Sequence, residues 1–141
     1  MFDKLVLTFM TICFVGCASN DIPKPPDCST TICTQNFVTL FVTINDASGV
    51  AIPLDSYKVV DTQTGEDITL TTGAEEFENY RDQGTYPILN DAYRMQYQNT
   101  NTTISFTGFI SGEEVVSERL VVGADCCHVQ LIAGNTAIII D

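Results

Sequence analysis

The sequence predicts an all-β fold, an antiparallel β-sandwich of about seven or eight short strands. Beyond Cys33, apolar and polar residues alternate with a period of two, as they do in strands with one buried face. Turn segments that contain glycine or proline separate these stretches at short intervals, and no stretch has the spacing of a long amphipathic helix. Residues 36–141 are therefore expected to form one β-sandwich domain with a hydrophobic core of its own.

The first half of this domain is expected to contain three strands. The clearest lies at 36–44, where threonines face one way and four apolar residues face the other, namely Val38, Leu40, Val42 and Ile44. A loop at 45–53 follows, and two shorter strands are expected at 56–62 and 67–72. The polar segment 73–85 is expected to hold a single helical turn.

The middle of the domain contains a short strand and an ambiguous segment. Residues 86–89 are expected to form the strand, and Pro87 would place it at a sheet edge because proline donates no ladder hydrogen bond. Residues 90–101 favour a short helix that begins at Asp91 as its cap. Two tyrosines would then share one face of that helix, Tyr93 and Tyr97.

The last third is expected to form two hairpins. The first joins 103–110 to 115–122, and Glu118 interrupts its apolar face, which a bulge or an edge position would explain. The second joins 127–133 to 137–140 through the turn residues between them.

The first seventeen residues have the pattern of an export signal. Lys4 precedes an apolar run of eleven residues, Leu5 to Val15, which is shorter than the roughly 20 residues of a membrane-spanning helix. The run ends in Phe-Val-Gly-Cys at 14–17, which resembles the lipobox of bacterial lipoproteins. This resemblance implies a signal peptide at 1–16 and lipidation of Cys17. A short buried helix with an incidental cysteine is the alternative interpretation.

Residues 17–35 would then comprise the lipidated Cys17, an extended proline-rich tether and the first cysteine pair. Ala18 stands where an aspartate would resemble the inner-membrane retention signal, so the resemblance favours the outer membrane of a cell envelope. The formal net charge is −12 at pH 7, and nucleic acids are also polyanions. The expected partners are therefore the membrane, through the anchor, and an envelope protein, but no nucleic acid.

A second resemblance lies within the domain. A strand that ends in Asp46-x-x-Gly49 is followed by a small loop and a second strand, and Gly-Thr-Tyr-Pro-Ile at 84–88 comes later. With the hairpin that follows, this order resembles the carboxypeptidase regulatory-like, or transthyretin-like, domains over 36–141. The resemblance implies an immunoglobulin-like or transthyretin-like sandwich with a non-catalytic accessory or structural role, and it implies no particular ligand.

Four cysteines remain for disulfides in an exported domain: Cys28, Cys33, Cys126 and Cys127. Pairing the last two with each other would require a strained ring between neighbours. On a strand these two side chains point to opposite faces, so each could reach a different partner in the first pair. We therefore predict two disulfides between the segments, with either pairing open. Each would close a loop of about 95 residues and contribute on the order of 4 to 5 kcal/mol.

Two other interpretations of these residues exist. Cys126 and His128 would share a strand face and could bind a soft metal ion with Cys28 or Cys33, although the spacing is not that of a zinc finger. A cysteine nucleophile with His128 as its base would need a free thiolate, which an oxidising compartment disfavours. We assign no catalytic residue, metal ligand or cofactor. The expected function is that of a lipid-anchored, non-catalytic envelope β-sandwich with a binding, adaptor or structural role. The alternative is a small-ligand or metal-binding module that uses Cys126 and His128.

Overall fold

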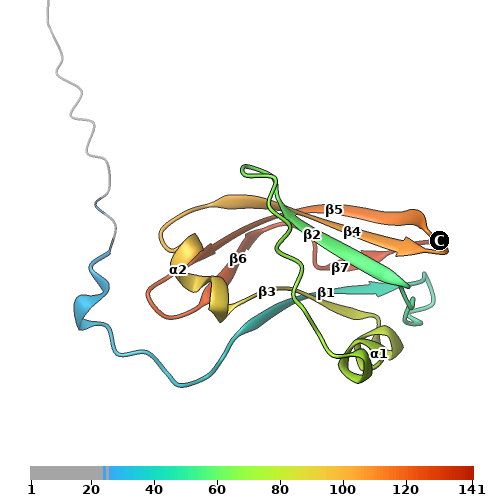
Figure 1. Cartoon of the computed structure of the whole chain (residues 1–141), viewed down its shortest axis with the longest axis horizontal. Helices are drawn as coiled ribbons and strands as arrows, with labels where there is room; N and C mark the ends of the chain where they lie inside the picture. The colour runs from blue at the N-terminus through green and yellow to red at the C-terminus, as the bar shows by residue number, and fades with distance from the viewer. Residues whose placement is uncertain (1–23, 25) are drawn as a thin grey trace, which may run out of the picture.

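The computed structural model describes residue 24 and residues 26–141. Two β-sheets pack face to face as a β-sandwich, which confirms the predicted fold class (Figure 1). Sheet A has the strand order β3-β1-β7 and sheet B the order β2-β4-β5-β6. The strands are β1 (Thr39–Asn45), β2 (Ser56–Asp61), β3 (Thr85–Asn90), β4 (Thr102–Ile110), β5 (Glu113–Ala124), β6 (Val129–Ala133) and β7 (Ala137–Ile139). The predicted signal peptide and Cys17 lie outside the described residues.

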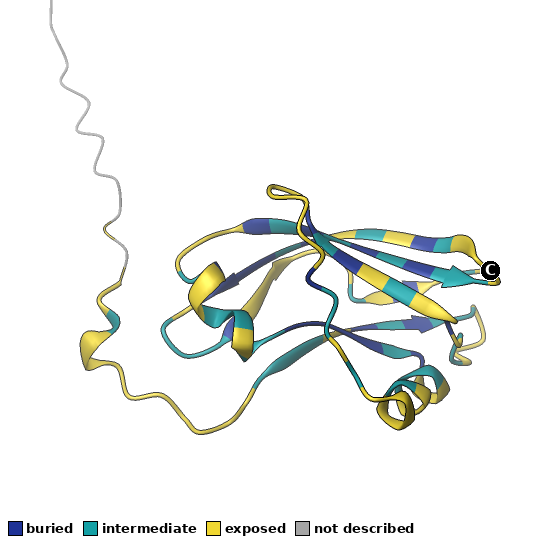
Figure 2. Ribbon diagram, in the orientation of Figure 1, coloured by how far each residue is buried: buried dark blue, intermediate teal, exposed yellow. Residues whose placement is uncertain are grey.

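The core lies between the two sheets, and the alternation in the sequence sets which side chains enter it. Along β4 every second residue is buried, from Thr102 to Gly108, and along β1 the predicted inward residues Val42 and Ile44 are fully buried. The largest buried side chains are Tyr86, Tyr97 and Phe106. The outer faces of the strands are more exposed (Figure 2). In β1 and β4 the period-two pattern therefore predicts the burial correctly, because one face of each strand is covered.

The segment 73–85 contains a helix of ten residues, α1 (Ala74–Gln83), where the sequence predicted a single turn. The ring of Phe77 stacks on Tyr57 of β2 with a centroid distance of 6.2 Å. The ring of Tyr80 lies 5.8 Å from that of Phe41 in β1. The helix is thus stabilised by aromatic contacts with both sheets, which its own polar sequence does not reveal.

Gly84→Ala is expected to lower the free energy of unfolding by about 2–4 kcal/mol. Gly84 ends α1 with a φ of 63°, and a Cβ there would lie 2.6 Å from the backbone oxygen of Ile44. Urea denaturation measures the loss. Gly73→Ala at the other end of α1 is the control, because its Cβ would meet nothing within 4 Å, and it should cost less than about 1 kcal/mol. Equal stability of the two variants would contradict the role of Gly84.

β3 and the hairpin of β4 and β5 form as predicted, but one predicted strand does not form. β3 lies at the edge of sheet A, as Pro87 predicted. The predicted hairpin of β4 and β5 is confirmed. Glu118 lies on the part of β5 beyond the four residues that pair with β6, so this part of the strand has a partner on one side only among the described residues. The predicted strand at 67–72 is wrong, since this segment makes only an isolated bridge between Asp67 and Val60.

The predicted second hairpin is also wrong, because its two strands lie in different sheets. β6 pairs with β5 in sheet B, whereas β7 runs parallel to β1 in sheet A. The chain crosses between the sheets at Gly134, whose φ is 117°. The first and last strands of the domain therefore share a sheet, and sheet A is mixed rather than wholly antiparallel.

Three short helical elements lie at one end of the sandwich: η1 (Cys28–Thr30), η2 (Asp91–Tyr93) and α2 (Arg94–Tyr97). The predicted cap was wrong by one residue, because the Asn90 side chain accepts the hydrogen bond of Ala92 N–H at 3.1 Å. Tyr93 and Tyr97 do lie together, with ring centroids 6.3 Å apart.

The buried carboxylate of Asp61 holds α2 against sheet B. Its Oδ1 accepts the N–H groups of Gln63 and Thr64, and its Oδ2 accepts the hydroxyl of Tyr97 at 3.0 Å. Burial and then the hydrogen bond to Asp61 raise the pKa of Tyr97, so this phenol stays a proton donor. The chain that leaves α2 therefore starts from a fixed position.

Candidate functional site

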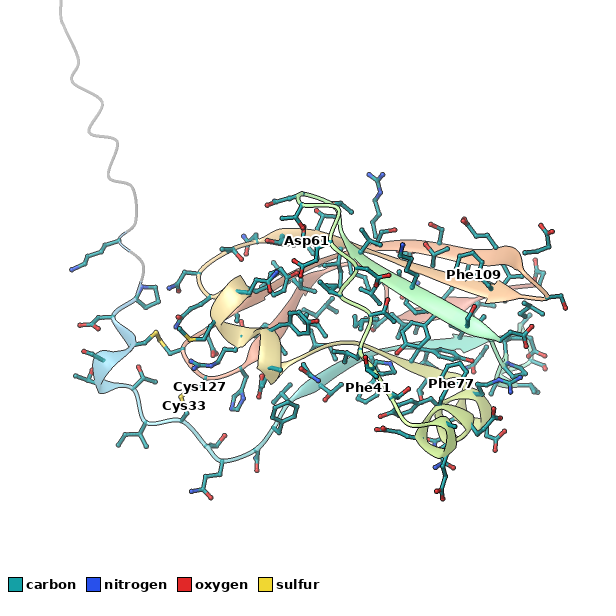
Figure 3. All side chains as sticks on the ribbon, viewed as in Figure 1. Cys33, Phe41, Asp61, Phe77, Phe109 and Cys127 are labelled. Atoms are coloured by element: carbon teal, nitrogen blue, oxygen red, sulfur yellow. A yellow bond between two sulfur atoms is a disulfide. The ribbon has the colours of Figure 1, made fainter. Side chains whose placement is uncertain are left out.

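Two disulfides join the N-terminal segment to the turn between β5 and β6. They are Cys28–Cys126 and Cys33–Cys127, each with its Cα atoms 5.3 Å apart. Figure 3 shows Cys33 and Cys127 together at the end of the sandwich where the N-terminal segment approaches. The prediction of two disulfides between the segments is thus confirmed, and the structure selects one of the two pairings. We call this region, residues 26–37 with 125–128, the stapled end.

The geometry behind the prediction was wrong in one respect. Cys126 and Cys127 lie in a turn between Ala124 and Val129 rather than on a strand. Asp125 builds this turn, since its Oδ1 accepts the N–H groups of Cys127 at 2.7 Å and His128 at 2.8 Å. The hydrogen bonds from His128 and Cys127 hold the pKa of Asp125 below its usual value. The turn therefore places two adjacent sulfur atoms toward the N-terminal segment.

Asp91 and His128 connect the stapled end to the sandwich. The Nδ1 of His128 lies 2.8 Å from Oδ2 of Asp91, and its Nε2 lies 3.0 Å from the hydroxyl of Thr34. Asp91 also accepts the backbone N–H groups of Val38 at 2.8 Å and Val129 at 2.9 Å. Its side chain is only 10% exposed. One carboxylate thus joins the start of β1 in sheet A to the start of β6 in sheet B.

The charge of Asp91 is favoured by these hydrogen bonds. Burial alone would raise its pKa, but the N–H groups of Val38 and Val129 and the ring of His128 together hold the pKa below its usual value. The carboxylate is therefore ionised wherever the protein is folded near neutral pH. Sequence reasoning missed its role, because the three partners are far from it along the chain.

The alternative interpretation was a metal site at Cys126 and His128. Both side chains are engaged within the protein. The sulfur of Cys126 is bonded to Cys28, and both ring nitrogens of His128 face oxygen atoms. While the disulfide is intact, Cys126 offers no thiolate to a metal ion. Within residue 24 and residues 26–141, no three side chains of His, Cys, Asp or Glu gather into a metal-binding group.

A cleft of about 670 Å³ lies beside the stapled end. It is bounded by the N-terminal segment, the chain after α2, the end of β5 and the outer residues of β6. Four side chains in its wall are carboxamides, so we call it the carboxamide cleft. The lining residues are Lys24, Pro26, Gln98, Asn99, Thr100, Asn101, Ala124, Asp125, Gln130 and Ile132.

The floor of this cleft is held by backbone contacts. Asn99 has a φ of 57°, and its N–H donates to the carbonyl of Ala124 at 3.0 Å. The N–H of Thr100 donates to the carbonyl of Tyr97 at 3.2 Å. Gly123 permits the close approach, because a Cβ there would lie 2.4 Å from the carbonyl oxygen of Thr100. These contacts fix the loop 98–101, so its side chains are presented to the cleft from a defined position.

A smaller hollow of about 280 Å³ lies on the outer face of sheet A. Phe37 and Tyr80 border it, and the Tyr80 hydroxyl donates to Glu76 at 2.7 Å. Phe37 is 65% exposed. Neither hollow was predicted from the sequence. The run Gln98-Asn99-Thr100-Asn101 is visible in the sequence, but its proximity to Gln130 depends on how β5 and β6 pair.

Comparisons of the chain with models of protein families, with curated proteins and with solved structures found no match. Among the described residues, no helix combines the length and the hydropathy that crossing a membrane requires.

Proposed function

We propose that this protein is an exported β-sandwich, tethered to the cell envelope through Cys17, with a binding or adaptor role and no catalytic activity of its own. The observation that carries the proposal is the pair of disulfides at the stapled end. Disulfides form and persist in oxidising compartments, so two of them in one small domain favour export. They also lie directly after the segment that would connect the domain to a lipid.

The proposed anchor restricts how the domain is presented. Cys17 precedes Cys28 by eleven residues, which span at most roughly 40 Å when fully extended. The stapled end would then face the membrane, and the turn between β4 and β5 at the opposite end would face away (Figure 1). That far end carries exposed acidic residues, Glu113, Glu114 and Asp141. Anionic headgroups would repel them, which favours the same orientation.

Replacing Cys17 by alanine is expected to release the domain from membranes or to leave the precursor unprocessed. The reason is that the thioether to the lipid cannot form, and no other membrane anchor is proposed. Fractionation of the cell envelope and intact-mass analysis measure the outcome. Cys13→Ala is the matched control, since it changes a cysteine of the expected signal peptide that is not the proposed lipidation site, and it should leave anchoring intact. A wild-type protein that retained Met1 and carried no acyl mass would overturn the proposal.

A further inference from the structure

We propose that the carboxamide cleft binds a neutral saccharide that carries acetamido groups. The proposal goes beyond membrane tethering and does not depend on it, because no residue before Lys24 lines the cleft. The charge of the cleft supports an uncharged ligand. The chain as a whole has a net charge of −12, but the two charged residues that line the cleft, Lys24 and Asp125, have opposite signs.

The carboxamides of the cleft have unused hydrogen-bonding capacity. Among the described residues, the side chains of Asn99 and Asn101 make no hydrogen bond, and both residues are exposed. Gln98 uses its Nε2 to contact the sulfur of Cys28 at 2.8 Å, and Gln130 uses its Nε2 to donate to Asp125 at 2.6 Å. The carbonyl oxygens of these two glutamines remain to accept from a ligand.

This set of groups fits a saccharide well. A carboxamide donates through nitrogen and accepts through oxygen, so it can pair with a hydroxyl group in either role and with an acetamido group through both of its polar atoms. Pro26, Ala124 and Ile132 supply apolar surface for C–H groups and for the acetyl methyl. The volume of about 670 Å³ lies within the ordinary range of ligand sites.

An extended polypeptide is the competing class of ligand. Such ligands are commonly held by main-chain hydrogen bonds to a free strand edge. In the loop that forms the floor, the N–H groups of Asn99 and Thr100 already donate within the protein. The loop therefore presents side chains rather than free N–H groups, which suits hydroxyl groups on a ring better than a linear main chain. Gln130 and Ile132 belong to β6 at the edge of sheet B, so the test includes a peptide that could pair there.

One wall of the cleft depends on a disulfide. Pro26 lies two residues before Cys28, and Gln98 contacts the sulfur of Cys28. The Cys28–Cys126 disulfide thus holds both the wall and a carboxamide in place before any ligand arrives. Preorganisation of this kind lowers the entropic cost of binding.

The test uses the full disulfide-bonded chain, purified in a zwitterionic detergent that has no sugar headgroup. The probes are the tetramer of N-acetylglucosamine and, as its counterpart without acetamido groups, cellotetraose. Side-chain amide signals in nitrogen-15 spectra and titration calorimetry report binding. We expect the acetylated tetramer to shift the signals of the cleft carboxamides in a saturable manner and to bind at least about tenfold more tightly than cellotetraose.

Variants separate the cleft from the rest of the surface. Asn101→Ala and Asn99→Gly should each weaken binding of the acetylated tetramer by about tenfold; glycine is chosen at 99 because it tolerates the positive φ. Asn79→Ala on α1 removes an exposed carboxamide outside the cleft and should leave affinity unchanged. The double variant Cys28→Ser, Cys126→Ser keeps the second disulfide and should also lose binding, through loss of the wall.

Three results would overturn the proposal. One is the absence of shifts at the cleft carboxamides with either tetramer. Another is equal affinity of wild type and Asn101→Ala, which would place the binding elsewhere. The third is a response of the same signals to a mixed Gly-Ser-Ala decapeptide but to neither saccharide, which would assign the cleft to polypeptides. None of these results bears on anchoring through Cys17, so the two proposals fail separately.

Discussion

Removing both disulfides is expected to lower the free energy of unfolding by about 7 kcal/mol, whereas removing either one should cost only about 2.5 kcal/mol. The variants are Cys28→Ser with Cys126→Ser, Cys33→Ser with Cys127→Ser, and all four replacements together. Guanidinium denaturation at neutral pH measures the three losses. Small domains have a total stability of about 5–15 kcal/mol, so the variant without disulfides should be at or near global unfolding at physiological temperature.

The loss for both disulfides exceeds the sum of the two single losses because of where the disulfides lie. Each closes a long loop when it is alone, with sequence separations of 98 and 94 residues. Once one disulfide exists, however, the other closes only a small ring, which consists of residues 28–33 and 126–127. A ring of that size restricts the unfolded chain far less than a loop of nearly a hundred residues. A loss of about 4 to 5 kcal/mol in the free energy of unfolding is therefore expected only when a disulfide is removed from a protein that has no other disulfide.

The double-mutant cycle tests this directly, because the coupling between the two disulfides should be about 2 kcal/mol. Ser29→Ala in η1 controls for a small change in the same segment and should have little effect. Additive losses of 4 to 5 kcal/mol for each disulfide would contradict the small-ring argument. Four free thiols in the exported protein would contradict the disulfides themselves.

Replacing Asp91 by alanine is expected to lower the free energy of unfolding by about 3–5 kcal/mol at neutral pH. The change leaves the N–H groups of Val38 and Val129 without their acceptor, and Val129 is buried. The His128 ring loses its partner at the same time. Asp91→Asn should cost less, about 2–3 kcal/mol, because one acceptor oxygen remains. Asp82→Ala, at an exposed position of α1, is the control and should change stability by less than about 0.5 kcal/mol.

The contribution of Asp91 should also depend on pH. Its pKa is lower in the folded protein than in the unfolded chain, so the contribution is complete above the unfolded pKa of about 4 and is lost as the pH falls through the folded pKa. The wild type should therefore lose stability in acid more steeply than Asp91→Asn, and the gap between them should narrow. Urea denaturation at pH 7 and near pH 2.5 measures the gap. A gap that stayed constant or widened in acid would show that the ionised carboxylate is not the stabilising species.

Local patterns in the sequence were enough for most of the strands, although not for the segment 67–72, and for the burial of alternate residues in three of them. The alternation in β1, β4 and β5 reflects a local rule, since successive side chains of a strand face opposite sides. Partners that lie far apart in the chain were harder to predict. The turn after β6 looks like that of a hairpin, yet Ile138 pairs with Ile44 in the other sheet. No local feature of the residues 137–140 distinguishes these two outcomes.

The helix α1 and the candidate site also depend on residues that lie far apart in the chain, which the sequence does not bring together. The segment of α1 contains few apolar residues, and what stabilises it is the position of Phe77 and Tyr80 against rings from both sheets. At the site, the four cysteines were identified from the sequence because compartment and number restrict their pairing. Asp91 was predicted only as a helix cap, because a carboxylate that accepts from Val38 and Val129 is recognisable only after the sheets are placed.

The position of the disulfides also decides how the domain would respond to mechanical tension on its N-terminal side. Without them, a pull on the chain before Cys28 would reach β1 first and would separate it from its neighbours one hydrogen bond after another. With them, the tension passes through the sulfur atoms to the turn after Ala124, and from there along the axis of β5. β5 is paired with β4 from Glu113 to Val122, and its last four residues pair with β6. Such a load acts on β5 in shear, so many ladder hydrogen bonds resist it at once, and the tension no longer reaches β1 first.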